Sequence, residues 1–259
     1  MDLSACIEWQ AAEGNDTLAD RVRAAKAAGL NHAEFHLWRD KLVDGDMAGL
    51  AAALDETGVT LTGFCVDPRR SIVDPAQHEE MLQAVADTLA VAKTVGSPPL
   101  IVASGFTREG ISPEEHKAEA VKVLRRAADL AEAAEVTLVL EPLNDRVEHP
   151  GMYLVDTTLA LDIIEAVGSP RLKLLYDVYH SHVMGEDMRK VLAGRIHLVE
   201  HVQVADSPGR NEPGTGTIDW PAAISTLRDL GYSGALGLEY RPTLDAAASL
   251  AASRAALGV

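Results

Sequence analysis

The sequence predicts a single (β/α)₈ barrel, an α/β fold of the TIM-barrel type, on three observations. Short apolar segments alternate from end to end with Ala-, Leu-, Glu- and Arg-rich segments of helical spacing. Strict alternation of this kind predicts a parallel sheet with right-handed crossovers. The 259 residues suit one barrel domain, residues 1–259, better than two small domains. The first apolar segment is not followed by the glycine-rich phosphate loop that an open doubly wound sheet usually carries.

Eight short apolar segments are expected to form the strands of this barrel. In chain order they are Leu3–Ile7, Ala33–Phe35, Val59–Phe64, Leu100–Ala103, Thr137–Leu140, Leu172–Tyr176, Leu198–Val204 and Ala235–Leu238. The number of repeats favours a closed barrel over an open sheet.

The clearest helical segment between these strands is Pro113–Glu135. Ser112 is its expected N-cap, and Glu115 stands three residues later, which is the pattern of a capping box. Two further helices carry similar start and stop signals, Asp156 with Gly168 and Asp219 with Gly231. The helix start and stop signals therefore fall between the expected strands, as the repeat of strand and helix requires.

The net charge of the chain argues against one class of partner. The net charge of −16 and the pI of about 4.9 argue against a nucleic-acid partner, because nucleic-acid binding needs a basic face. They do not exclude an anionic substrate, since local arginines and a metal ion can outweigh a distant field. The expected partner is therefore a small molecule.

The cysteines and the N-terminal segment bear on the compartment. Two cysteines, Cys6 and Cys65, form no disulfide framework, so a reducing cytoplasm is the expected location. The segment MDLSACIEW has neither a basic region nor an apolar core, so no signal peptide is expected. Apolar runs stay short of the ~18 residues that a membrane helix requires.

Four acidic or amide residues end consecutive strand segments in the second half of the chain. They are Glu141 in TLVLEPLN, Asp177 in LKLLYDVYH, Gln203 in HVQVAD and Glu239 in GALGLEY, at spacings of 36, 26 and 36 residues. Each spacing fits one strand plus one helix. In a barrel, the C-terminal ends of all strands meet on the catalytic face. Three carboxylates and an amide oxygen that converge there predict a divalent-cation site.

Each of these residues alone is better explained as a solvated loop residue or a helix cap. Four at corresponding positions are not. A carboxylate that directly follows a run of aliphatic residues is half buried, which is costly unless it is paired or bound to a metal. Gln203 is the weakest member, because its amide also fits a hydrogen-bonded core position in the barrel mouth.

The same segments carry a resemblance to a known family. EPLN, YDVYH, HVQVADSPGRNEPGTG and GLEYRP resemble the corresponding segments of the hydroxypyruvate isomerase family, within the xylose-isomerase-like barrel superfamily. The likeness covers roughly Val136 to Pro242, and the stretch through GRNEPGTG is its most specific part.

The resemblance implies a Mg²⁺ or Mn²⁺ ion, with Co²⁺ also suited, at Glu141, Asp177, Gln203 and Glu239. It also implies that Glu141 and Glu239 shuttle the proton. These roles are chemically sound. Moving a carbonyl to the adjacent carbon requires removing a proton from one carbon atom and returning a proton to its neighbour. The metal would stabilise the enediolate as a Lewis acid.

Three polar residues are predicted to contact the substrate. His180, three residues after Asp177, would donate a hydrogen bond to a substrate oxygen, although a structural role fits a loop histidine too. Arg210 and Arg241 are candidates for a substrate carboxylate, because a guanidinium matches that anion with two parallel bonds. For Arg241 a salt bridge between loops is an equal alternative.

The first half of the chain contributes two weaker candidates. Trp38 would form an apolar wall of the pocket, although an exposed packing role fits it equally well. Cys65 would touch substrate, although the role of a small buried filler is favoured for it. GFCVDPRR and ASGFTREG, after the third and fourth strands, depart from the family pattern. The substrate is therefore left more open than the reaction class.

The leading hypothesis is a metal-dependent aldose–ketose isomerase that interconverts hydroxypyruvate and tartronate semialdehyde. Isomerisation of 2-oxo-tetronate and 3-epimerisation of a ketose are alternatives, although the epimerases typically carry histidine where Gln203 stands. Two other classes are an apurinic endonuclease, which needs several zinc ions and a basic surface, and a barrel that binds sugar acids without turnover. The apolar tail LAASRAALGV is compatible with a homo-oligomer.

Overall fold

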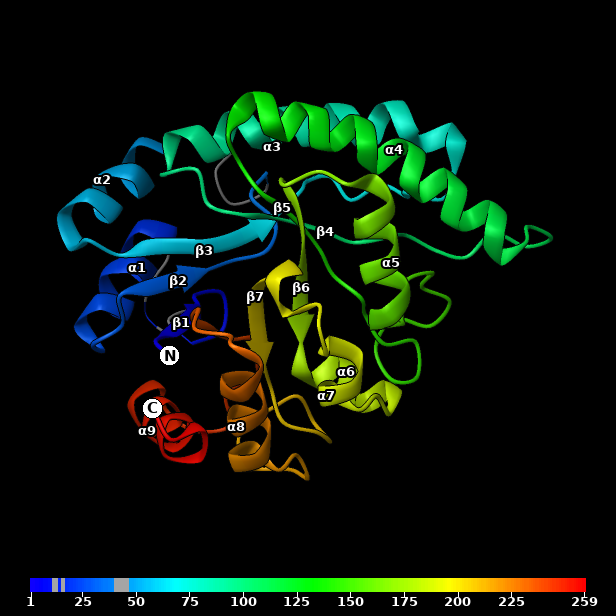
Figure 1. The fold of residues 1–259 in the computed structure, drawn as a ribbon. Coiled ribbons are helices and arrows are strands. Elements are labelled where there is room, and N and C mark those ends of the chain that lie inside the picture. Colours follow the sequence, from blue (N-terminus) through cyan, green and yellow to red (C-terminus); the bar gives the residue numbers. More distant parts are fainter. Residues whose placement is uncertain (11–13, 15–16, 40–46) are drawn as a thin grey trace.

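The computed structural model shows a closed barrel of parallel strands with helices around it (Figure 1). It describes residues 1–10, 14, 17–39 and 47–259. The strands are β1 Leu3–Cys6, β2 His32–Glu34, β3 Thr60–Cys65, β4 Leu100–Val102, β5 Leu138–Leu140, β6 Leu172–Asp177, β7 Val199–Val204 and β8 Leu236–Leu238. They pair in chain order, and β8 closes the barrel on β1. The predicted fold class is confirmed, and every expected strand is present within two residues at each end.

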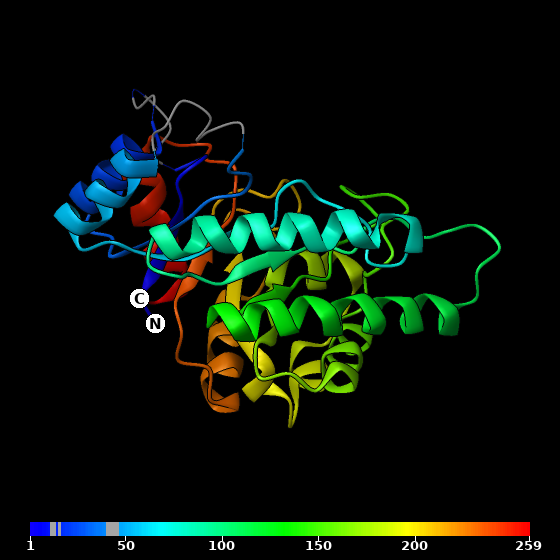
Figure 2. The ribbon, with the colours of Figure 1, turned by 90° about the horizontal axis from the view of Figure 1, so that it is seen from above.

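Helices follow most strands and cover the barrel from outside. They are α1 Leu18–Ala27, α2 Met47–Thr57, α3 His78–Thr94, α4 Pro113–Ala134, α5 Thr157–Val167, α6 Val178–Met184, α7 Met188–Leu192, α8 Trp220–Leu230 and α9 Ala246–Leu257. Short 3₁₀ turns occupy Pro75–Gln77 and Ile196–Leu198. The two longest helices, α3 and α4, run side by side (Figure 2).

Helix α4 begins as its sequence predicts. The Ser112 hydroxyl accepts from the backbone N–H of Glu115 at 3.2 Å, and the Glu115 carboxylate accepts from the backbone N–H of Ser112 at 3.0 Å. The helix ends one residue earlier than expected, because Glu135 adopts a left-handed conformation with φ of 59° and forms the C-cap. Asp156 and Asp219 cap α5 and α8 as predicted, and Gly168 and Gly231 end them.

A buried polar group lies inside the barrel around Glu34. One carboxylate oxygen contacts His201 Nε2 at 2.6 Å and accepts from the Thr62 hydroxyl at 3.0 Å. The other accepts from Gln203 Nε2 at 2.9 Å. His201 therefore supports this carboxylate, which in turn orients the Gln203 amide. A Cβ atom at Gly237 on β8 would stand 2.5 Å from the same carboxylate, so only glycine leaves it room.

Replacing Gly237 with alanine should destabilise the protein by about 1–3 kcal/mol, because the added methyl group overpacks the Glu34 carboxylate. Gly63→Ala on β3 is the matched control, since its Cβ would meet its nearest neighbour at 3.4 Å, an ordinary contact. The control should stay within about 1 kcal/mol of the parent. Urea-induced unfolding measures both. Equal losses in the two variants would show that Glu34 does not set the requirement for glycine.

Candidate active site

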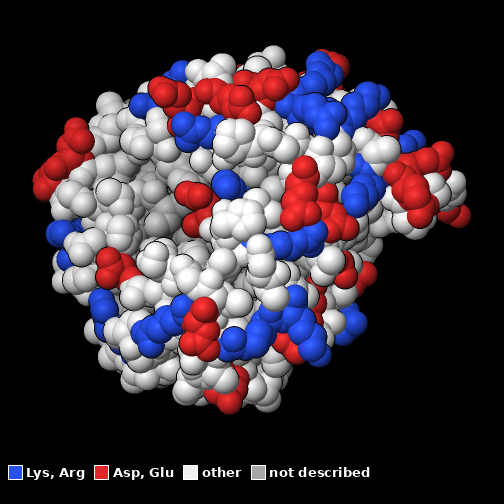
Figure 3. All heavy atoms as spheres, in the orientation of Figure 1, with Lys and Arg blue, Asp and Glu red and all other residues white. Residues whose placement is uncertain are grey.

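A cavity of about 400 Å³ opens at the C-terminal ends of the strands. Glu141, His180, Arg210 and Glu239 are among the residues that line it. Figure 3 shows acidic and basic side chains interleaved around the rim of one face, with acidic atoms beside a basic one in the hollow near its centre. The cavity is thus polar and carries charges of both signs.

The predicted carboxylates meet in this cavity. Glu141 directly follows β5, Asp177 is the last residue of β6, and Glu239 directly follows β8. Oxygen atoms of these three residues and a ring nitrogen of His180 all lie within 4.8 Å of one another, and all four residues are buried. Gln203 lies on β7 in register with Asp177. The four strand ends therefore come together as the spacing predicts.

Two oxygen atoms at this place are buried and lack a hydrogen-bond donor. Asp177 accepts from the backbone N–H of Tyr179 through Oδ1 at 2.8 Å, which caps α6, while its Oδ2 has no hydrogen-bond partner. Gln203 donates through Nε2 to Glu34, and its Oε1 is also without a partner. A buried acceptor without a partner is costly, and a hard cation satisfies such oxygens. The donor set therefore fits a divalent metal ion.

The titration of the carboxyl groups supports the same conclusion. Burial raises the pKa of Glu141 to about 8, and the neighbouring Glu239 adds to the effect. Burial and Glu239 likewise raise the pKa of Asp177 well above its usual value. For Glu239, burial is outweighed by Arg210 and His36, and its pKa falls. Only one of the three is thus fully compensated by protein cations, and a divalent ion would compensate the others.

Arg210 is the main counter-charge of Glu239. Its side chain is 7% exposed; Nη2 donates to Glu239 Oε2 and Nη1 donates to Glu148 Oε2 at 2.6 Å. The guanidinium also lies 5.6 Å from the ring centre of Trp9 and 5.2 Å from that of Tyr179. Arg210 therefore neutralises a protein carboxylate, and its contact with a substrate carboxylate stays a prediction.

The loop that carries Arg210 is fixed by Asp206, which lies two residues past the end of β7. The Asp206 carboxylate accepts from the backbone N–H of Gly214 at 2.7 Å, from that of Ile218 at 3.2 Å and from the indole of Trp220 at 2.8 Å. Arg210 itself has a positive φ of 54°, which costs free energy in a residue other than glycine. The loop thus holds Arg210 in a conformation that the chain would otherwise avoid.

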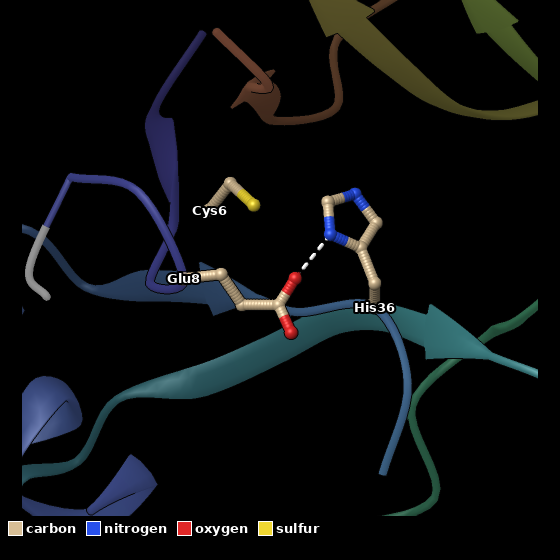
Figure 4. Close-up of side chains that lie close together, drawn as sticks. All are labelled: Cys6, Glu8 and His36. Atoms are coloured by element: carbon tan, nitrogen blue, oxygen red, sulfur yellow. Dashed lines mark hydrogen bonds and ion pairs between the residues drawn. The ribbon is translucent and has the colours of Figure 1, made fainter. Parts of the chain in front are cut away.

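Sequence reasoning missed a second counter-charge, His36. Its Nε2 contacts Glu239 Oε1 at 2.6 Å, and its Nδ1 contacts Glu8, as the dashed line in Figure 4 marks. Both ring nitrogens face carboxylates, so both must donate and the ring is protonated. Burial opposes that charge, but the hydrogen bond to Glu239 and the charge of that carboxylate help to raise the pKa of His36 to about 11. His36 lies two residues past the end of β2, so the alternation of faces along the strand gave no signal for it.

The hydrogen bonds of His180 determine which nitrogen carries its proton. Nδ1 accepts from the backbone N–H of Asn144 at 3.2 Å and lies 2.7 Å from Asn144 Nδ2. The Asn144 Oδ1 accepts from the backbone N–H groups of Val147 and Glu148, so its Nδ2 is a donor. A neutral ring must then carry its proton on Nε2, which is buried without a hydrogen-bond partner. His180 is therefore a donor aimed at the site, not a metal ligand in this tautomer.

The other predicted contacts have mixed outcomes. Arg241 is 65% exposed and lies 3.7 Å from Glu148, which matches the alternative of an ion pair between loops. Cys65 lines the cavity but is buried among apolar strand residues. The prediction that Trp38 forms a wall of the cavity is wrong. Its indole donates to Thr88 at 3.1 Å, and its ring lies under Arg39. Trp38 packs against the core instead. Two residues beyond His36, it lies past the end of β2.

Comparison with known proteins places the chain in a family. Residues 22–256 match the model described as xylose isomerase-like TIM barrel. The chain belongs to that family. Hydroxypyruvate isomerase of Escherichia coli K12 is 33% identical over 68% of this chain and 68% of its own length. The putative hydroxypyruvate isomerase of Streptomyces coelicolor is 33% identical over 89% and 88%, and the 2-oxo-tetronate isomerase of Cupriavidus necator is 29% identical over 89% and 90%.

Solved structures agree with the fold of this xylose isomerase-like barrel. A crystal structure named AP endonuclease, family 2, from Brucella melitensis is 26% identical, with a TM-score of 0.84 and 97% of each chain covered. L-ribulose 3-epimerase is 21% identical, with a TM-score of 0.80 over 98% and 92%, and shows the fold alone. The resemblance inferred from the motifs is confirmed, and the names of the relatives agree with the predicted isomerase class.

No helix among the described residues is long and apolar enough to cross a membrane.

Cys6 of this barrel should be chemically inert. Burial raises the pKa of its thiol to about 12, and the thiolate is the reactive species. In a Cys65→Ala background, a chromogenic disulfide reagent at about pH 8 should modify Cys6 of the native protein far more slowly than Cys6 of the protein unfolded in denaturant, because burial leaves little thiolate and blocks access to it. Reaction should be complete in denaturant. Labelling of the native protein at the rate seen in denaturant would contradict the assignment.

Proposed function

We propose that this protein is a metal-dependent isomerase that interconverts hydroxypyruvate and tartronate semialdehyde. The observation that carries the proposal is the meeting of Glu141, Asp177 and Glu239, with unpartnered oxygens on Asp177 and Gln203, at the mouth of the barrel. The names of the curated relatives support the same reaction class and the same kind of substrate, a small hydroxy-keto acid. A metal ion held between these acids would by itself explain why they are buried together.

The residues that would hold the metal are Glu141, Asp177, Gln203 and Glu239. All four offer hard oxygen atoms, which suit Mg²⁺ or Mn²⁺, and Co²⁺ also binds such sets. When bound, the cation would polarise the substrate carbonyl and stabilise the negative charge that develops on deprotonation. The remaining chemistry belongs to the side chains.

Proton transfer falls to the two glutamates. Glu239 follows β8 and is kept ionised by Arg210 and His36, so it is ready to take a proton from the hydroxyl-bearing carbon. Glu141, which follows β5, delivers a proton to the adjacent carbon, and the roles exchange in the reverse direction. His180 donates from Nε2 to a substrate oxygen, which stabilises the charge of the deprotonated substrate.

A four-carbon acid is the second candidate substrate. The cavity of about 400 Å³ is much larger than a three-carbon acid requires, and one curated relative is named 2-oxo-tetronate isomerase. Ketose 3-epimerisation is a weaker alternative, since Gln203 stands where the epimerases typically carry histidine. Residues 1–259 as one domain, and a homo-oligomer, stay predictions.

Activity should depend on metal and on both glutamates. Protein stripped with a chelator should not convert hydroxypyruvate, and Mn²⁺ or Mg²⁺ should restore turnover, followed through a reductase that consumes tartronate semialdehyde. Glu141→Gln and Glu239→Gln should each lower kcat by about 10²- to 10⁴-fold, because the substituted amide cannot exchange the proton. Glu109→Gln, at an exposed position, is the control. Full activity without metal, or in either site variant, would refute the mechanism.

Metal binding can be tested separately from turnover. Asp177→Asn keeps a side chain that caps α6 well but removes the charge, so the fold should persist while Mn²⁺ affinity falls by at least about 10-fold. Calorimetric titration with Mn²⁺ measures the affinity, and circular dichroism checks the fold. Unchanged Mn²⁺ affinity in a folded variant would remove Asp177 from the ligand set.

The alternative substrates should be tested in the same turnover assay. 2-Oxo-tetronate and a set of ketoses should be assayed beside hydroxypyruvate.

A further inference from the structure

Arg69, on the loop after β3, is a cation of the active-site cavity that the mechanism above leaves without a task. It lines the same cavity as Glu141 and Glu239. Among the described residues, its side chain makes one polar contact, from Nη2 to Cys65 Sγ at 3.8 Å. The sulfur of a buried thiol is a weak acceptor, so the five donors of this guanidinium are largely unused.

The other cations of the cavity are already committed to protein carboxylates. Arg210 donates to Glu239 and Glu148, and His36 lies between Glu8 and Glu239. Arg241 is mainly in solvent and lies 3.7 Å from Glu148. Arg69 differs from all three, because no carboxylate of the described residues lies at ion-pair distance from it.

The place of Arg69 in the cavity also distinguishes it. A second cavity of about 390 Å³ adjoins the first, and both are lined by Arg69, Ala103 and His149. Arg69 thus stands where the two spaces meet, on the wall formed by the loops after β3 and β4. Desolvation lowers the pKa of Arg69, but Cys65 and, to a smaller extent, the charges of Glu141 and Glu239 raise it, so the guanidinium lies within the field of the reacting carboxylates.

We infer that Arg69 binds the carboxylate of the substrate and selects acids over neutral sugars. A planar guanidinium receives a carboxylate through two parallel charge-assisted bonds. The side chain of Arg69 is exposed, lines the cavity and makes one polar contact, with Cys65, so its donors are available for such bonds. With the carboxylate held at Arg69, the adjacent carbons reach toward Glu141 and Glu239. The inference rests on the proposed function and replaces Arg210 and Arg241 in the role that the sequence suggested for them.

The test compares an acid with a neutral molecule of the same carbon skeleton. For hydroxypyruvate, Arg69→Gln should lower kcat/KM by about 10- to 100-fold, mainly through KM. For dihydroxyacetone, which lacks the carboxylate, kcat/KM should change by less than about 3-fold. Arg69→Lys should retain part of the preference, because the charge stays but the fork is lost. Arg70→Gln is the matched control, since Arg70 pairs with Glu80 at 2.6 Å.

A binding measurement separates this inference from the reaction. Tartronate, an unreactive three-carbon diacid, should bind the parent protein in calorimetry and bind Arg69→Gln about 10-fold more weakly or worse. That result supports Arg69 even if no keto acid is isomerised. An equal loss on acid and neutral substrates, or equal tartronate affinity in both proteins, would overturn Arg69 while leaving the isomerase standing. A parent protein that binds no tartronate would overturn it as well.

Discussion

Repulsion among buried carboxylates is the constraint around which the barrel mouth is arranged. Glu141, Asp177 and Glu239 lie in a small volume from which water is largely excluded, where like charges cannot all persist without cations. Arg210 and His36 compensate Glu239 from two sides. The left-handed backbone of Arg210 and the loop fixed by Asp206 are local costs of placing that compensation correctly, and a divalent ion is the remaining part of the balance.

The sequence predicted those features that depend on the repeat of strand and helix. Glu141, Asp177, Gln203 and Glu239 end consecutive strands, so the closed barrel brings them together whatever the detailed packing. His36 was missed because its importance arises from a contact across the barrel with Glu239, 203 positions away, and Glu8 was missed because it acts through His36. Such contacts have no periodic signal.

Errors in the first half of the chain have a similar origin. Trp38 was expected on the cavity wall by proximity to the end of β2, yet alternation of faces applies only within a strand, and the chain turns before this residue. Arg69 was passed over because DPRR resembles any charged loop, and only the structure shows which of two adjacent arginines is paired with a glutamate. Loop side chains are assigned by partners that the linear sequence does not reveal.

Asp177 has a consequence for how this family tolerates substitution. One of its oxygens starts helix α6, which carries His180, and the other faces the site. A change that removes both oxygens therefore damages architecture and chemistry in a single step, whereas Glu141 starts no helix. Substitution of Asp177 is therefore opposed for two separate reasons. A related barrel that no longer catalyses the reaction should still retain Asp or Asn at this position to cap α6, even where Glu141 has been replaced.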